Sequence, residues 1–368
     1  MTRRILLLAV CFLMTSALMA ATVSKEQAQQ AAAAFLQKRM ANGDGPRRAA
    51  GTTPQLTMAT QVSGLYVFNV NSQDGFIIVS NDDRTETILG YADTGCFDAQ
   101  NIPDNMRAWL QGYADEIAWA KQHQSQTFKL PRRAAVKAAI EPLMKTHWNQ
   151  GSPYNGYCPF YLEDANGKVI DYSTTQTTDS YKQCVTGCVA TAMAQVMYYN
   201  SWPTATTVSI PSYTWKDYEG TDDDIVLYEL PTTTFDWDNM LLDYGSSSNW
   251  NDGQGVAVAK LMQYCGYSLK MNYGPSSGTN TSNVANALKT YFDYHETTEY
   301  LDRRFYSYEN WINLIYNELS QKRVIIYSGQ SAGGGHAFIC DGNQTEDYFH
   351  INWGWGGMSD GYFKLSAL

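Results

Sequence analysis

The sequence contains few cysteines and histidines for its length. Its 368 residues include 7 cysteines and 5 histidines, and Cys11 lies in the apolar N-terminal segment. The remaining cysteines are too sparse for a disulfide framework in a chain of this length. Cys184 and Cys188 are close together, but no second pair of cysteines or histidines lies nearby to complete a zinc site. We therefore predict neither a bound metal nor another cofactor.

The chain also lacks an excess of basic residues and a long apolar run. It has 26 Lys and Arg against 36 Asp and Glu, a formal charge of −10, and no basic patch stands out. Nucleic acid is therefore not an expected partner. Beyond the first twenty residues no stretch is long and apolar enough to cross a bilayer, so no membrane partner is expected either.

The first twenty residues have the pattern of an export signal. Arg3 and Arg4 precede an apolar run over residues 5–14, and small residues follow up to Ala20 and Ala21. This order is typical of a secretory signal peptide, which is removed from the mature protein. We predict a signal peptide over residues 1–20 and a secreted product.

A basic, weakly patterned segment between Leu130 and Ile140 divides the rest of the chain into two parts. The first part begins with a capping box at Ser24 and Gln27, which opens an alanine-rich helix to about Met40. Alternating apolar residues and turn signals then predict antiparallel strands, and a proline in a first turn predicts a second helix. The strands are expected at 56–62, 65–70 and 75–83, and the helix at 103–123.

The second part is predicted to be one α+β domain. Apolar residues at helical spacing come first, and alternating runs follow near the C-terminus. The helices are expected from residue 188 onward and at 254–264, 282–292 and 308–319. The strands are expected at 323–329, 335–342, 347–355 and 361–365.

The helix in "TGCVATAMAQVMYY" begins with Cys188, directly after a glycine. Unpaired backbone N–H groups and the helix dipole favour an anion at that position, and a thiol there ionises more easily. Cys188 is therefore a candidate nucleophile. The alternative is a buried core cysteine, because free cysteine is among the most buried residue types.

A catalytic cysteine needs a base, and two histidines lie in the C-terminal strands. His336 follows three glycines, and a hairpin centred on Gln344 would place it opposite Asn352, whose amide could hold the imidazole. Trp353 could shield that hydrogen bond from water. His350 is the rival base, but we expect it to pack beside the site or lie at the surface.

Several long motifs, in order along the chain, resemble the streptopain family of bacterial cysteine peptidases. They span about residues 145–368, and the segment "GFIIVSNDDRTETILGYADTGCFDA" resembles the propeptide of that family. The resemblance implies a papain-like α+β peptidase domain behind an α+β propeptide domain with an antiparallel sheet. The motifs are "WNQGSPYN", "GCVATAMAQVMYY", "MNYGPSSG", "GGHAFICDG" and "HINWGWGGMSDGYFKL".

The resemblance also implies roles for single residues. Cys188 matches the nucleophile, His336 the general acid/base, and Trp353 the tryptophan that holds the histidine, with Asn352 beside it. A further group matches or adjoins positions that line the substrate groove: Ser276, Ser277, Thr279 and Gly335.

Two features depart from the expected pattern. Papain-like enzymes often place an oxyanion-hole glutamine six residues before the cysteine, but Lys182 stands there and Gln183 follows it. We therefore assign the oxyanion hole mainly to the Cys188 backbone N–H, with Gln183 as a candidate. Family members also continue past "FKLSAL", so a shortened C-terminus at Leu368 is expected.

Taken together, these features predict a secreted cysteine endopeptidase made as a self-processing zymogen. Its expected parts are the signal over 1–20, an inhibitory propeptide over 21–138 and the peptidase domain over 139–368. Its expected partners are protein and peptide substrates and its own propeptide. Two alternatives remain: a transglutaminase-like acyltransferase with the same Cys–His pair, and a non-catalytic secreted binding protein.

Overall fold

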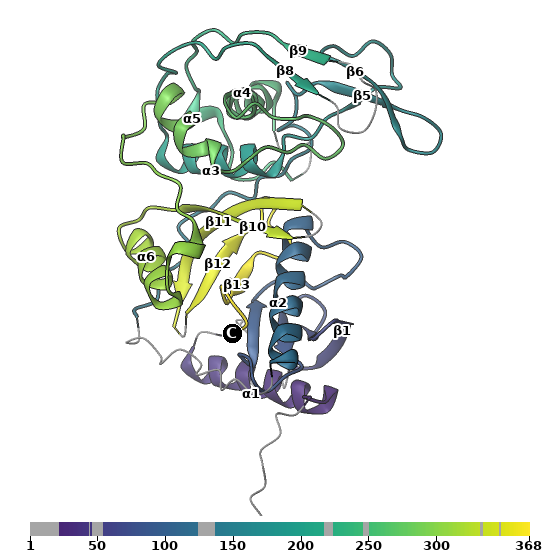
Figure 1. Ribbon diagram of the computed structural model, residues 1–368, viewed down its shortest axis with the longest axis vertical. Coiled ribbons are helices and arrows are strands. Elements are labelled where there is room, and N and C mark those ends of the chain that lie inside the picture. Colours follow the sequence, from purple (N-terminus) through teal and green to yellow (C-terminus); the bar gives the residue numbers. More distant parts are fainter. Residues whose placement is uncertain are drawn as a thin grey trace, which may run out of the picture.

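The computed structural model divides into two lobes stacked along the long axis of the molecule (Figure 1). The sheet lobe holds a large antiparallel sheet with helices on it, and the helical lobe holds α3, α4, α5 and small sheets. The predicted signal peptide and most of the predicted boundary segment lie outside the described residues. The structure describes residues 22–43, 45, 54–123, 137–216, 224–245, 250–331, 334–345 and 347–368.

Within these residues, eight strands form one sheet that both parts of the chain share. Their order is β1-β2-β3-β4-β13-β12-β11-β10, and every neighbouring pair is antiparallel. The two halves join where Tyr91 and Gly90 of β4 pair with Tyr362 and Phe363 of β13. The strands are β1 (Leu56–Val62), β2 (Leu65–Val70), β3 (Phe76–Ser80), β4 (Ile88–Ala92), β10 (Ile325–Ser331), β11 (Gly334–Gln344), β12 (Tyr348–Asn352) and β13 (Gly361–Phe363).

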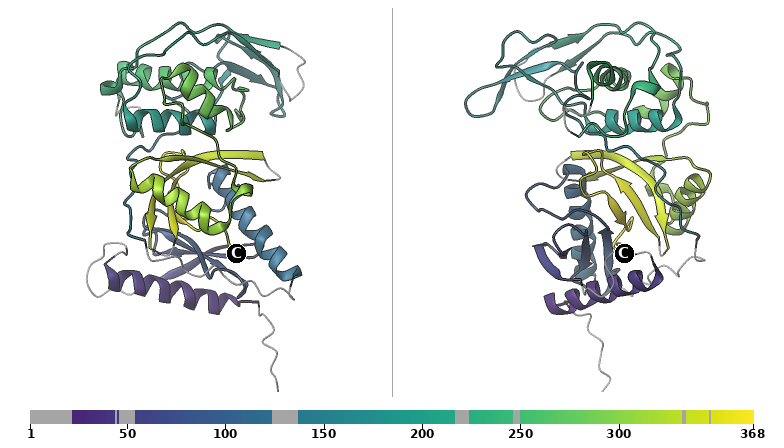
Figure 2. Two further views of the ribbon diagram at one scale, coloured as in Figure 1. Left: turned by 60° about the vertical axis from the view of Figure 1, so that its left-hand side comes forward. Right: turned by 180° about the vertical axis from the view of Figure 1, so that it is seen from behind.

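Three helices cover this sheet. Helix α1 (Lys25–Asn42) packs on β2, β3 and β4, and the predicted capping box between Ser24 and Gln27 is confirmed. On the other face α2 (Asp104–Gln122) contacts β10 and β11, and α6 (Tyr308–Ser320) packs beside it. Figure 2 shows α1 along the bottom of the sheet lobe and α2 rising toward the helical lobe. The first part of the chain thus reaches strands of the second part.

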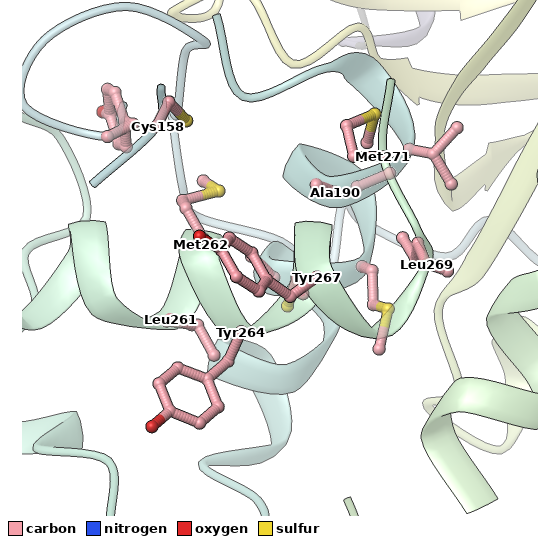
Figure 3. Packing of buried hydrophobic residues seen from close by; sticks show 14 of the residues in the cluster. Cys158, Ala190, Leu261, Met262, Tyr264, Tyr267, Leu269 and Met271 are labelled. Carbon is pink, nitrogen blue, oxygen red and sulfur yellow. The ribbon is translucent and has the colours of Figure 1, made fainter. Parts of the chain in front are cut away.

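The helical lobe is built around α3 (Cys188–Asn200), which packs against α4 (Asp252–Ser268). Its small and apolar residues, Ala190 among them, lie in one core with Leu261 and Met262 (Figure 3). At the base of this lobe α3 also contacts β10 and β11 (Figure 1). The remaining elements are β5 (Phe160–Glu163), β6 (Val169–Ser173), β7 (Lys182–Gln183), β8 (Tyr213–Lys216), β9 (Asp224–Leu227), α5 (Asn283–Tyr291) and two short 3₁₀ helices, Trp237–Asn239 and Arg303–Phe305.

The predicted helices are all present, but the predicted hairpin register is wrong. The chain does not turn at Gln344; that residue pairs with Tyr348, and a bulge at Asp341 then shifts the pairing. Asn352 therefore lies opposite Ile339, and His336 pairs with Gly329 on β10. The hairpin turns between Gln344 and Tyr348, later in the chain than expected, and this accounts for most of the error in register; the bulge changes the pairing by one residue only.

The described ranges contain neither a membrane-spanning helix nor a metal-binding cluster. None of the helices there has the length and apolar character needed to span a membrane. In the same ranges, no group of three or more His, Cys, Asp or Glu side chains is arranged to hold a metal ion.

Candidate active site

Cys188 is the first residue of α3, as the sequence predicts. The preceding residue, Gly187, has φ 85°, a conformation that side chains rarely adopt. A Cβ added there would also lie 2.9 Å from Met271 Sδ and 3.0 Å from the carbonyl oxygen of Ser277. Only glycine fits, so the turn that delivers Cys188 to the helix start depends on it.

The thiol of Cys188 faces strand β11. Its Sγ accepts a hydrogen bond from the backbone N–H of Ala337, at 3.4 Å. Burial raises the pKa of the Cys188 thiol, and the backbone N–H groups of Ala337 and Val189 only partly oppose that shift. The expectation of a readily ionised thiol is therefore wrong for the full-length chain, because desolvation outweighs the favourable helix start.

His336 is next to Ala337, so β11 brings the predicted base to the cysteine. The imidazole is half-buried; burial lowers its pKa, while Asp104 at the start of α2 acts in the opposite direction. Throughout the described part of the chain, no hydrogen bond joins the His336 ring to Cys188 or to another group. The thiol therefore lies against the strand position next to His336, and the pKa shifts favour the neutral form of both side chains.

The first turns of α2 cover this region. The buried Asn105 amide donates to the Trp353 carbonyl at 2.6 Å and to the Ala337 carbonyl at 3.4 Å. One turn later, the Trp109 ring packs edge-on against Phe338 and Trp353, with centroids 5.4 and 6.1 Å apart. Helix α2, from the first part of the chain, therefore packs on Trp353 and on Phe338, which lies two residues after His336.

Asn352 does not hold His336. Its Nδ2 donates to the Thr146 carbonyl at 2.8 Å, while its Oδ1 accepts from Gly354 N at 3.0 Å and from Gln195 Nε2 at 3.5 Å. The predicted His336–Asn352 contact is therefore wrong, since the register shift turns that amide toward α3.

Trp353 is almost fully buried beside the site. Its indole Nε1 donates to the Ser359 carbonyl and its backbone N–H to Asp360 Oδ1, both at 2.9 Å. The ring packs against Phe338, two residues after His336. Trp353 thus supports the strand that carries the histidine, although the hydrogen bond it was expected to shield is absent from the described residues.

The rival base, His350, which we expected to pack beside the site or lie at the surface, is partly buried and pairs with Asp341. Its Nδ1 lies 2.6 Å from Asp341 Oδ1, and the Asp341 side chain is fully buried. Burial lowers the pKa of His350, but the Asp341 carboxylate raises it by more, so the net shift is upward. A histidine held by a buried carboxylate in this way is poorly placed to accept a proton from Cys188.

The side-chain donor of the oxyanion hole needs revision. Gln183 Nε2 donates to the Cys158 carbonyl at 3.3 Å, so this candidate is used within the β5–β7 sheet. Gln150, in the motif "WNQGSPYN", contacts the segment that leads into α3. Its carbonyl accepts from Thr186 N at 3.1 Å, two residues before Cys188, and its side-chain amide has no hydrogen bond within the described ranges.

The predicted groove residues divide into two groups. Ser277 Oγ donates to the Val185 carbonyl at 2.7 Å, and Thr279 Oγ1 donates to the Leu269 carbonyl at 2.7 Å, so these hydroxyls hold their loop in place. Ser276 and Gly335 are exposed. A contact with substrate stays a prediction for all four; of these, Ser277 is buried and Thr279 is half-buried.

Comparisons with known proteins agree with this geometry. Residues 148–363 match the model of the peptidase C10 family, and residues 20–117 match that of the Spi protease inhibitor. Streptopain from Streptococcus pyogenes serotype M28 is 33% identical over 361 residues, which cover 94% of this chain and 85% of streptopain. The thiol protease/hemagglutinin PrtT of Porphyromonas gingivalis is 30% identical over 370 residues, 95% of this chain but 39% of PrtT.

Two solved structures of interpain A from Prevotella intermedia are also similar. A prointerpain A fragment superimposes with a TM-score of 0.69 and 28% identity, over 85% of this chain and 92% of the fragment. The active wild-type protease gives 0.51 and 31%, over 64% of this chain and 90% of the protease. These findings do not favour the acyltransferase or the non-catalytic alternative. The chain is a cysteine protease made as a zymogen, with an inhibitory N-terminal propeptide, and it belongs to the peptidase C10 family.

Proposed function

We propose that Cys188 is the nucleophile of this peptidase and that His336 is its general acid/base. The observation that carries the proposal is the 3.4 Å hydrogen bond from Ala337 N to Cys188 Sγ, which fixes the helix start against the strand position next to His336. Cys188 is also the only cysteine of the described residues that stands at the start of a helix.

The reaction then follows in two halves. His336 takes the thiol proton, and the Cys188 thiolate attacks the peptide carbonyl to form a tetrahedral intermediate. The Cys188 backbone N–H, and the amide of Gln150, stabilise the oxyanion. His336 returns the proton to the leaving amine, which leaves a thioester. Water, deprotonated by His336, releases the acid and restores the thiol.

The propeptide holds the pair in an unreactive state. Asn105 and Trp109 of α2 rest on Trp353 and the residues after His336, and burial keeps both the thiol and the imidazole neutral. Release of α2 would let water reach the site and let the imidazole approach Cys188 Sγ, so that the proton can pass between them.

We assign the parts of the chain as a signal peptide over 1–20, the propeptide over 21–138 and the peptidase domain over 139–368. Export outside the cell follows from the N-terminal sequence pattern. Protein and peptide chains are the substrates, and the propeptide is the first of them. The cut that releases it would fall in the segment between Leu130 and Ile140, largely outside the described residues.

A substitution of the base tests the assignment. His336→Ala in the matured enzyme should abolish peptide hydrolysis and also remove the fast alkylation of Cys188 near neutral pH, because the thiol loses its proton acceptor. His295→Ala, at an exposed histidine outside the site, is the matched control and should behave as wild type. Full hydrolysis by the His336→Ala enzyme would exclude His336 as the base.

A further inference from the structure

Three buried polar side chains form a closed ring of hydrogen bonds behind the site. Thr146 Oγ1 donates to Gln195 Oε1 at 2.6 Å, Gln195 Nε2 donates to Asn352 Oδ1 at 3.5 Å, and Asn352 Nδ2 returns to the Thr146 carbonyl at 2.8 Å. Their exposed fractions are 2%, 0% and 3%. We call these three residues the polar ring.

The polar ring joins three segments that are far apart in the sequence. Thr146 belongs to the segment that enters the peptidase domain, Gln195 to α3 of the helical lobe, and Asn352 to the end of β12 in the sheet lobe. Figure 1 shows that the two lobes meet where α3 lies next to β11 and β10. The ring therefore crosses the boundary that also separates the nucleophile from the base.

Gln195 lies on the same side of α3 as Cys188, about two turns further along the helix. Thr191 lies between them, and a Cβ built on Gly354 would be 3.4 Å from its Cγ2. One face of α3 thus contacts the C-terminal strands at two points: Cys188 accepts a hydrogen bond from Ala337 of β11, and Gln195 donates one to Asn352 of β12. The contact at Gln195 fixes both the rotation and the distance of the helix.

The groups of the ring have no easy replacement partners. Asn352 Oδ1 also accepts a hydrogen bond from Gly354 N at 3.0 Å. Loss of the Asn352 side-chain amide would therefore leave a buried donor unpaired in each lobe, Gln195 Nε2 in the helical lobe and Gly354 N in the sheet lobe. A buried polar group without a partner costs about 1–3 kcal/mol, which favours a single arrangement of the two lobes.

We propose that the polar ring positions the Cys188 helix against the His336 strand, with Gln195 and Thr146 as positioning residues for the reaction. On this account Asn352 holds the two lobes together instead of orienting the imidazole. The inference rests on the proposed roles of Cys188 and His336. A misplacement of about 1 Å between reacting groups can lower a rate by about 100-fold, so small shifts across this boundary suffice.

A double-mutant cycle on the matured enzyme tests the proposal. The variants are Gln195→Met, Asn352→Leu and both together, prepared as full-length chains and converted by immobilised wild-type enzyme. Each single change should lower kcat by about 10- to 100-fold with little change in KM, because substrate binding is not altered. The double variant should be no slower than the slower single, since one ring is broken either way.

The pH profile separates positioning from histidine orientation. If the ring positions the lobes, both single variants keep the wild-type pH limbs of kcat/KM and lose rate in parallel. If Asn352 instead orients the imidazole, Asn352→Leu alone shifts the limb of the kcat/KM profile that reports the titration of His336. The profile of Gln195→Met then stays close to that of wild type. That result, or losses that multiply in the double variant, would overturn the proposal.

Two further comparisons keep the test decisive. If Gln195→Met does not fold, Thr146→Val and Thr146→Ser replace it. Thr146→Val should have a lower kcat than wild type, and Thr146→Ser, which keeps the hydroxyl, should have the wild-type kcat. Equal kcat values for the two variants would refute the role of the hydroxyl. Asn200→Ala removes a side-chain hydrogen bond to Val196 elsewhere on α3 and should leave kcat unchanged. Failure of the catalytic assignment is seen separately, as hydrolysis by Cys188→Ala or His336→Ala.

Discussion

Asn105 of the propeptide donates a 2.6 Å hydrogen bond to the main-chain carbonyl of Trp353 in the peptidase domain. The same amide reaches the carbonyl of Ala337, whose N–H holds the Cys188 thiol. The propeptide helix therefore contacts the backbone of β11, which carries His336, and the backbone directly after β12.

Removal of the Asn105 amide should weaken the restraint that the propeptide places on the site. We expect Asn105→Ala to raise the alkylation rate of Cys188 in the uncut chain by about tenfold, since a lost buried hydrogen bond costs about 1–3 kcal/mol. Because burial raises the pKa of this thiol, the wild-type rate should climb only at alkaline pH, and the variant rate should climb at lower pH. Intact mass spectrometry of the iodoacetamide adduct measures both. Asn101→Ala, at an exposed asparagine nearby, should match wild type; equal rates for all three chains would contradict the restraint.

The oxyanion hole can be tested with two glutamines. Gln150→Ala should lower kcat by about 100- to 1000-fold, the usual effect of losing one donor, with little change in KM. Gln183→Ala should have a small effect, because its amide is used at the Cys158 carbonyl. Steady-state hydrolysis of a peptide by the matured variants measures both effects. A larger loss of kcat for Gln183→Ala than for Gln150→Ala would assign the oxyanion-hole donor to Gln183 instead.

The buried pair of His350 and Asp341 should contribute to stability in a pH-dependent way. The folded state raises the pKa of His350 above its ordinary value, so the contribution is complete below pH 6.5 and falls as pH rises through the folded-state pKa. His350→Gln should cost roughly 3–5 kcal/mol at pH 6, because the buried Asp341 carboxylate loses its charged partner and keeps only the hydrogen bond from Met144 N.

That cost should shrink as the pH is raised toward 9. Denaturant unfolding at both values measures it, and His295→Gln, at an exposed histidine, should change stability by less than about 0.5 kcal/mol. A cost that grows with pH would show that the histidine is neutral in the folded chain.

The mature enzyme should begin upstream of Ile140. The Ile140 N–H donates to the Asn343 carbonyl at 2.7 Å, and Asn343 N returns to the Ile140 carbonyl at 2.9 Å. Met144 N also donates to Asp341 Oδ2 at 2.8 Å. N-terminal sequencing of the active species should therefore find a first residue between Arg132 and Ala139. An active species that begins after Met144 would show that this pairing is dispensable.

Local signals in the sequence were sufficient for much of the fold. The side chains of Ser24 and Gln27 define the start of α1, and the glycine before Cys188 marks the start of α3, because each depends on residues a few positions apart. The pairing of Tyr91 with Tyr362 could not be predicted in this way. It joins strands of two domains across most of the chain, and no local pattern encodes a partner that distant.

The placement of Cys188 at a helix start and of His336 in a strand could be predicted, but the contacts around them could not. Cys188 and His336 follow from a helix start and a strand, yet the neutral state of the thiol depends on burial, which the complete fold determines. The hairpin turns between Gln344 and Tyr348, later than expected, so Asn352 lies opposite Ile339 and its side chain contacts Gln195 instead of the histidine. The contact that makes Gln150 a candidate joins its carbonyl to Thr186 N, 36 residues away in the sequence, and no local pattern predicts it.

The most direct test of the account follows the Cys188→Ala chain and the wild-type chain in parallel by intact mass and by peptide hydrolysis. We predict that the wild-type chain shortens within the segment between Leu130 and Ile140 and gains activity as it does so. Cys188→Ala should keep its propeptide, show no hydrolysis, and be cut at the same place when active wild-type enzyme is added. Cys188→Ala that shortens alone at the wild-type rate, or that hydrolyses peptide, would contradict the assignment of Cys188 as the nucleophile.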